Sequence, residues 1–129
     1  MSNQLPKQSS NRQLLNEVNK VVQEKDDVAL ERLLNGSKDQ LALKDIHMIA
    51  LRQCQEGADM IILAIAKFLK SLQNVAVETK DEVAKMEVDQ VMSNMLRVCC
   101  EKSNKDLTKI LVSMGANPND GLLGASISG

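Results

Sequence analysis

The chain has 129 residues, of which 43% are hydrophobic but only 1% aromatic, so we expect a core of aliphatic side chains and methionine. This length supports one compact domain rather than two. The 16 basic and 17 acidic side chains nearly cancel, which removes the strong positive field that nucleic-acid-binding proteins use and disfavours that class.

The first segment, residues 1–12, is polar, which predicts a disordered lead-in. It lacks the charged start and apolar run of a secretory signal, so no export is expected. The three cysteines, Cys54, Cys99 and Cys100, are odd in number and form no Cys-x-x-Cys arrangement, which is typical of a reducing compartment. We therefore expect an intracellular protein, cytoplasmic or nuclear, with delivery into a host cell still open.

Residues 14–34 predict two short amphipathic helices, because apolar residues recur at helical spacing on both sides of the polar break Glu24-Lys25-Asp26-Asp27. Gly36 is expected to end the second helix in the left-handed conformation, which costs glycine little.

A second pair follows, with Asp45 as the predicted N-cap of a helix that reaches Cys54 and a break at Glu56-Gly57. The next helix, over residues 58–72, is apolar nearly all round, which predicts that it is covered on several sides. Its apolar run ends at Lys67, well short of the roughly 20 residues that span a bilayer. No membrane span is therefore expected.

Thr79-Lys80-Asp81-Glu82 has the form of a capping box and predicts an extended helix from Thr79 to about Lys102. Two adjacent apolar stripes on this helix predict neighbours on two sides. The stripes are Val83, Val91, Met95 and Val98, and beside them Val88, Met92, Leu96 and Cys99. Ser103-Asn104 ends the helix and caps a short one that closes at Gly115, before a turn over residues 117–121.

The chain contains an internal repeat. Residues 17–35 align with residues 94–112 at a constant offset of 77, and the middle pair joins them at an offset of 45, so the units lie 32 and 45 residues apart. Such a period predicts helix pairs that stack, because one pair alone cannot bury its apolar face.

The last unit carries the most specific pattern. Leu107 to Asn119 reads LTKILVSMGANPN, which resembles the second helix and the start of the finger turn of an ankyrin repeat. The resemblance covers residues 94–120 well and residues 14–72 more weakly. Asn94-Met95-Leu96-Arg97 stands where that family has Thr-Pro-Leu-His, and the first two units lack the Gly-Ala-Asn-Pro-Asn turn, which predicts that their long fingers are missing.

The resemblance implies an all-α fold: a short α-solenoid of about three stacked helix pairs over residues 13–121. Residues 122–129 would then form a partial repeat or a C-terminal tail. It also implies a non-catalytic interaction module of adaptor, inhibitor or effector type, which binds a protein partner through its inner helices and turn tips. We expect no nucleic acid and no membrane, and a monomer or weak homo-oligomer. The alternative is a self-associating helical bundle with a structural or assembly role.

Residues able to carry chemistry are few. His47 is the only histidine, and no Ser or Cys stands at a spacing diagnostic of nucleophilic catalysis. Cys99 and Cys100 could form a redox pair or join Cys54 and His47 at a metal, but neighbours on a helix point about 100° apart and converge poorly on one ion. We therefore expect buried thiols, a structural His47, and no catalytic, cofactor-binding or metal-binding residue. A helical enzyme or metal protein would need a polar pocket around these groups.

Two further sets of residues were open to more than one interpretation. The acidic pairs at residues 26–27, 81–82 and 87–89 are interleaved with lysines, which favours capping and solubility over acid–base catalysis. The methionines could line an adaptable groove, but in a chain without aromatic residues they are expected to fill the core. They are Met86, Met92, Met95 and Met114.

Overall fold

The computed structural model describes residues 11–36 and 40–114, in which six helices and no strand are present. The all-α prediction is confirmed. Arg12 begins the first helix and Asn11 caps it, and the rest of the predicted lead-in, residues 1–10, lies outside the described residues. Gly115, the turn at residues 117–121 and the end at 122–129 lie outside the described residues. The helices are α1 (Arg12–Gln23), α2 (Asp27–Gly36), α3 (Leu43–Glu56), α4 (Asp59–Glu78), α5 (Glu82–Glu101) and α6 (Lys105–Ser113).

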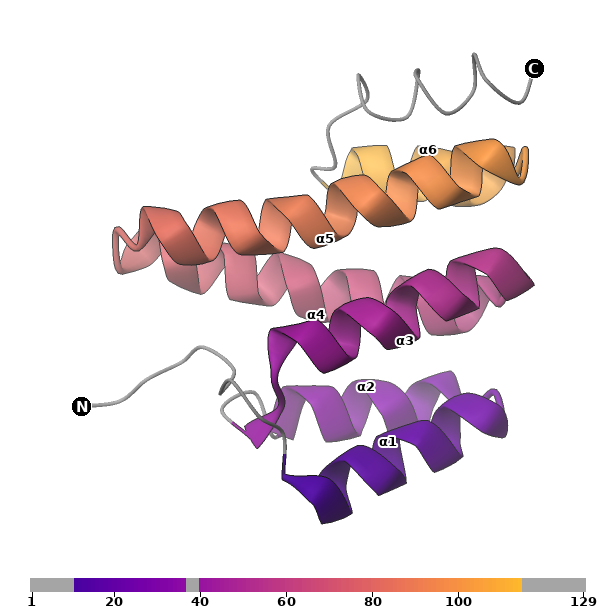
Figure 1. Cartoon of the computed structure of the whole chain (residues 1–129), viewed down its shortest axis with the longest axis horizontal. Helices are drawn as coiled ribbons and strands as arrows, with labels where there is room; N and C mark the ends of the chain where they lie inside the picture. The colour runs from indigo at the N-terminus through magenta and orange to yellow at the C-terminus, as the bar shows by residue number, and fades with distance from the viewer. Residues whose placement is uncertain (1–10, 37–39, 115–129) are drawn as a thin grey trace.

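The helices form hairpins that stack in chain order: α1 with α2, α3 with α4, and α5 with α6 (Figure 1). The first helices of the hairpins, α1, α3 and α5, lie in one layer, and α2, α4 and α6 lie behind them in a second layer. In the second layer α4 packs against both α2 and α6, and in the first layer α3 packs against α5. Close packing between α1 and α3 is missing from the described part of the chain, and the first layer is therefore loosest at this point.

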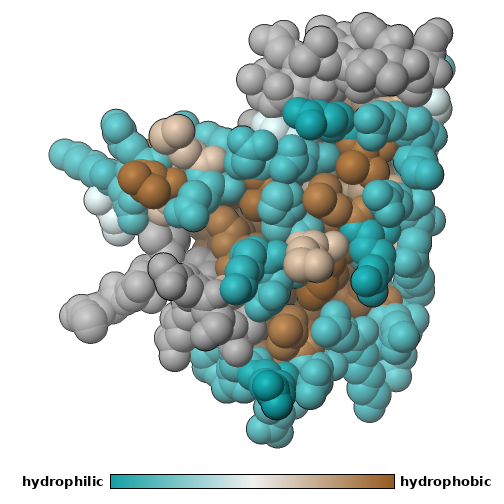
Figure 2. All heavy atoms as spheres, in the orientation of Figure 1, coloured by the Kyte–Doolittle hydropathy of each residue, from teal (hydrophilic) through white to brown (hydrophobic). Residues whose placement is uncertain are grey.

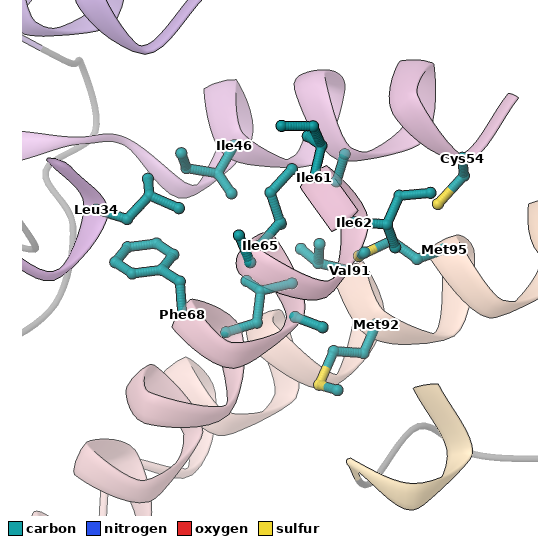
Figure 3. Close-up of a cluster of buried hydrophobic side chains, with 14 of the residues drawn as sticks. Leu34, Ile46, Cys54, Ile61, Ile62, Ile65, Phe68, Val91, Met92 and Met95 are labelled. Atoms are coloured by element: carbon teal, nitrogen blue, oxygen red, sulfur yellow. The ribbon is translucent and has the colours of Figure 1, made fainter. Parts of the chain in front are cut away.

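Helix α4 is the centre of the molecule, as its all-round apolar sequence predicts. It packs against α2, α3, α5 and α6. In Figure 3 its side chains Ile61, Ile62, Ile65 and Phe68 lie among apolar side chains of α2, α3 and α5. Each large apolar side chain that is fully buried contributes about 1.5–3 kcal/mol. This cluster is therefore the main source of stability.

The hairpin turns repeat one backbone conformation. Lys25, Gly57 and Ser103, which each follow the first helix of a hairpin, have φ angles of 59°, 74° and 58°. Lys80, between α4 and α5, has a φ of 57°. The internal repeat is thus visible in the turns, but with a shift. Ser103 rather than Lys102 occupies the position equivalent to Lys25, one residue later than the offset of 77 predicts.

Two predicted helix starts are wrong. Asp45 lies inside the first turn of α3, whose N-cap is Ala42. Thr79 is the C-cap of α4, where its hydroxyl donates to the Val75 carbonyl at 2.9 Å. Asp81 caps α5 instead and accepts from the Ala84 amide at 3.1 Å. The long helix that the sequence predicts is present, but it begins at Glu82, the last residue of the predicted capping box, rather than at Thr79.

Gly36 and Val83 also differ from expectation. Gly36 stays helical as the last residue of α2, and among the described glycines only Gly57 is left-handed. Val83, placed in an apolar stripe by the sequence, is 68% exposed. Its position explains this, because the turn between α4 and α5 lies beyond the neighbouring ends of α2 and α3 (Figure 1).

Candidate binding groove between α1 and α3

A groove of about 590 Å³ lies between the C-terminal halves of α1 and α3. One wall comes from α1 and the other from α3. The lining residues recur at helical spacing and are Asn16, Asn19, Lys20, Val22 and Gln23 of α1, Lys25 of the following turn, and Ile49, Arg52, Gln53 and Glu56 of α3. The groove thus opens in the layer of first helices, at its one loosely packed junction.

The helices are tied together on both sides of this opening. At their N-terminal ends, the Asn11 amide donates to the Gln40 carbonyl at 2.9 Å. Near their C-terminal ends, the Lys25 ammonium lies 3.1 Å from Gln53 Oε1 and 3.2 Å from Glu56 Oε1. The walls of the groove are therefore joined by polar contacts at two fixed positions rather than by close packing of α1 on α3.

The floor of the groove is apolar and its walls are polar. Val22 is 5% exposed, and Ile49 is a partly buried residue packed against the core. Figure 2 shows this kind of surface on the face formed by α1, α3 and α5, where hydrophobic atoms lie between polar side chains of adjacent helices. Eight of the ten lining residues are polar, so the groove is more polar than the usual pocket for a small molecule.

Gln53 is the most buried polar residue of the groove, at 3% exposure. Its Oε1 accepts from Lys25, but its Nε2 donates to no described residue. Every fully enclosed side-chain nitrogen and oxygen in the described part of the chain has a partner. The Gln53 Nε2 therefore reaches the open groove, where it is a free donor for a ligand.

Two cations face the groove from opposite walls. Lys20 on α1 and Arg52 on α3 line it, and neither side chain forms an ion pair or hydrogen bond with any residue that the structure describes. The one lining carboxylate, Glu56, is paired with Lys25 at 3.2 Å. The groove therefore carries two unneutralised positive charges, together with carboxamides. None of its lining residues is a histidine, cysteine or serine.

His47 lies elsewhere in the same layer and links α3 to α5. Gln90 Nε2 donates to Asn94 Oδ1 at 3.2 Å, which orients the Asn94 amide so that its Nδ2 donates to His47 Nε2 at 3.1 Å. His47 is therefore neutral with its proton on Nδ1, and burial lowers the pKa of the ring. Asn94 thus supplies a hydrogen bond between two hairpins.

The cysteines divide into two groups, and all three are buried. The Cys99 thiol of α5 beside Cys54 of α3, together with burial, raises the pKa of Cys54, and the Cys54 thiol lowers the pKa of Cys99. Cys100 lies against α6, with Sγ 3.6 Å from Thr108 Oγ1. Within the described ranges, no three His, Cys, Asp or Glu side chains are grouped as metal ligands would be.

The methionines and carboxylates occupy mostly structural positions. Met92 and Met95 are fully buried and Met114 packs against the core, whereas Met86 is 69% exposed. Asp26 and Asp81 cap α2 and α5. Asp89 accepts from Gln73 and pairs with Lys85 at 3.4 Å. The remaining members of the acidic pairs lie in or near the first turns of α2 and α5.

Sequence reasoning identified none of the groove residues. A signal was present in α1, because Asn16, Asn19 and Gln23 form a polar row with a spacing of three and four residues. That row is indistinguishable from an ordinary solvated face until the distance to α3 is known.

Comparison with known proteins identifies no family: no family model matches the sequence, and no similar curated protein or solved structure is found. Among the described helices, α4 alone is long and apolar enough to cross a membrane, and 56% of its most apolar window is buried inside the chain. Core helices of soluble proteins have the same properties, so this helix is weak evidence for a membrane span.

Proposed function

We propose that the chain is a non-catalytic protein-interaction module, of adaptor, inhibitor or effector type, which works inside the cell. It binds a protein partner through the first-helix layer of a short, ankyrin-like α-solenoid. The observation that carries this proposal is the groove between α1 and α3, which opens in that layer and presents polar groups without partners, among them Lys20 and Arg52. An exposed concave layer of stacked hairpins is the surface that repeat proteins use to bind.

The arrangement of the hairpins supports the ankyrin-like part of the proposal. The hairpins stack in chain order, their first helices share one layer, and each hairpin turn has a left-handed residue at the same point. Only Thr79, Lys80 and Asp81 connect α4 to α5, which leaves no room for a finger between the second and third units. The helices therefore supply most of the proposed binding surface, and the turn tips less.

The alternative function, a self-associating bundle, receives mixed support. The most apolar helix, α4, is already covered by four helices of the same chain, so it is not available as an interface. A specific observation in its favour is the exposed apolar tip of the α4–α5 hairpin, formed by Val77, Val83 and Met86, which are 54%, 68% and 69% exposed. Large exposed apolar side chains in one place mark contact surfaces.

Solution mass separates the two functions. We expect a monomer by light scattering across the micromolar range, because the core of the chain is complete within one copy. A stable dimer that Val83→Ser with Met86→Ser converts to monomer would favour the bundle.

The interaction itself is tested by affinity capture with the folded chain and with Leu107→Asp. Leu107 is 0% exposed, so a charge there unfolds the domain. We expect partners that the native chain retains and the variant loses, followed by a 1:1 complex when one such partner is purified. Proteins captured equally by both chains would contradict a fold-dependent module.

A further inference from the structure

We propose that the groove between α1 and α3 binds a short, extended, acidic segment of the partner protein. This inference rests on the proposed function and names the occupant of its surface. It follows from the shape of the groove, the position of two cations and the identity of the polar groups in its walls.

The groove has the dimensions of a short extended peptide. On each wall the lining residues extend over eight positions, from Asn16 to Gln23 on α1 and from Ile49 to Glu56 on α3. At about 1.5 Å per residue, each wall is roughly 10 Å long, which corresponds to about three residues of extended chain. The occupant is therefore a segment with one side chain toward the apolar floor of Val22 and Ile49.

The charges of the walls select an acidic segment. Lys20 and Arg52 face the groove from opposite sides, without ion pairs to the described chain. A carboxylate between them would pair with both, and the Arg52 guanidinium can bind it through two parallel hydrogen bonds.

The other nearby charges do not cancel this preference. Glu56 is already paired with Lys25. The C-terminal ends of α1 and α3 contribute partial negative charge that decays within the last turn, and Lys25 is the cation placed there. Lys20 lies in the last turn of α1, where its own charge offsets the partial negative charge of the helix end. Arg52 is four residues before the end of α3, so a carboxylate bound to Arg52 is about one turn away from that end.

The carboxamides in the walls match a peptide backbone. Asn16, Asn19 and Gln23 make no side-chain hydrogen bond in the part of the chain that the structure describes, and the Gln53 Nε2 is a free donor at the floor of the groove. Each carboxamide offers both a donor and an acceptor, the two kinds of group that every extended residue carries. A simple anion would use the cations and leave these groups unused.

The ends of this chain are poor candidates for the occupant. Residues 1–10 contain no acidic residue, and residues 115–129 contain only Asp120. Nucleic acid is also disfavoured, because the only aromatic ring, Phe68, is 1% exposed and offers no stacking surface. The net charge of −1 gives no long-range attraction for phosphates. An acidic segment of another protein remains as the occupant.

The test uses two peptide pools of about nine residues, one with Asp or Glu at alternate positions and one with Asn or Gln in their place, titrated into the ¹⁵N-labelled full chain. We expect the acidic pool to shift the amide signals of residues 16–25 and 49–56. The variant Lys20→Glu with Arg52→Glu should weaken that binding at least about tenfold. The matched control Arg32→Glu with Lys109→Glu has the same change in net charge on exposed positions of α2 and α6, and should bind as the native chain does.

Three outcomes would overturn the assignment: equal shifts from the uncharged pool, shifts that survive Lys20→Glu with Arg52→Glu, or the same shifts produced by inorganic phosphate or by a mixed-sequence RNA oligomer. A failure of this inference is distinct from a failure of the proposed function. A purified partner that binds the native chain and the groove variant equally would remove the groove assignment while retaining a fold-dependent module, whereas loss of all fold-dependent capture would remove both.

Discussion

Lys25 and Gln53 form the contact that holds the C-terminal end of α1 against α3. The Lys25 ammonium nitrogen lies 3.1 Å from Oε1 of a carboxamide that is 3% exposed. The same ammonium pairs with Glu56, but both partners of that ion pair are about half exposed, and such pairs contribute roughly 0–1 kcal/mol. The hydrogen bond to the buried amide is therefore the more important of the two contacts.

Lys25→Met should lower the free energy of unfolding by about 1–2 kcal/mol, because it leaves the buried Gln53 oxygen without its donor. Methionine has an apolar side chain of similar length to the lysine stem. It also has a similar energetic cost in the left-handed backbone conformation at this position, so the backbone contribution is unchanged. The control is Lys20→Met, which removes a cation without a partner and should change stability by less than about 0.5 kcal/mol. Urea unfolding measures both. Equal changes in the free energy of unfolding for the two substitutions would show that the Lys25 contact does not contribute measurably to stability.

Gly36→Ala and Gly57→Ala should act in opposite directions. A methyl group at either position meets nothing within 4 Å, so the difference is one of backbone conformation alone. Gly36 is helical, and alanine there should stabilise the chain by about 0.5–1 kcal/mol. Gly57 has a φ of 74°, and alanine there should destabilise it by about 1 kcal/mol. Thermal unfolding of the two variants measures both effects. A change in midpoint temperature of the same sign for both variants would refute the prediction.

His47 should make stability depend on pH. Its folded pKa lies below the ordinary value of 6.5 because of burial, and its Nε2 accepts from Asn94 only when the ring is neutral. The stabilising contribution is present above the unfolded pKa and is lost as the pH falls toward the folded one. The native chain should therefore lose stability relative to His47→Gln between about pH 7 and pH 5. A constant difference over that range would contradict the assigned hydrogen bond.

The thiols should be unreactive in the folded chain. Cys54 and Cys99 are 1% and 0% exposed, Cys100 is 9% exposed, and the pKa of Cys54 is raised. Alkylation needs an exposed thiolate, so labelling by iodoacetamide at pH 8 should proceed through unfolding and be at least about a hundredfold slower than in urea. Mass spectrometry counts the modified sites. Fast single-site labelling at Cys99 without urea would show that its lowered pKa outweighs its burial.

The helices were predictable because the apolar residues of each one recur at the helical spacing. Val18 and Val22, or Leu107 and Leu111, recur at the helical spacing and are buried where the spacing places them. Helix starts were less predictable, since Thr79 and Asp81 are both good caps and only the continuation of α4 to Glu78 excludes the first. The exposure of Val83 was not predictable either, because it depends on how far the neighbouring helices extend.

The groove and the His47–Asn94 bond depend on distances between helices, which a single sequence does not contain. Asn94 and His47 are 47 residues apart, and Lys25 and Gln53 are 28 apart. Each of these residues has an unremarkable position in its own helix. Their roles arise from how the hairpins are stacked.

The weak attachment of α1 has a dynamic consequence. Among the pairs of described helices, α1 packs closely against α2 alone and meets α3 mainly through the polar ties at Asn11 and Lys25. In native-state hydrogen exchange, its amides should therefore open at a lower free energy than those of α4, which has close neighbours on several sides. A segment bound between α1 and α3 would slow that exchange, and the end of the array would become rigid only when it is occupied.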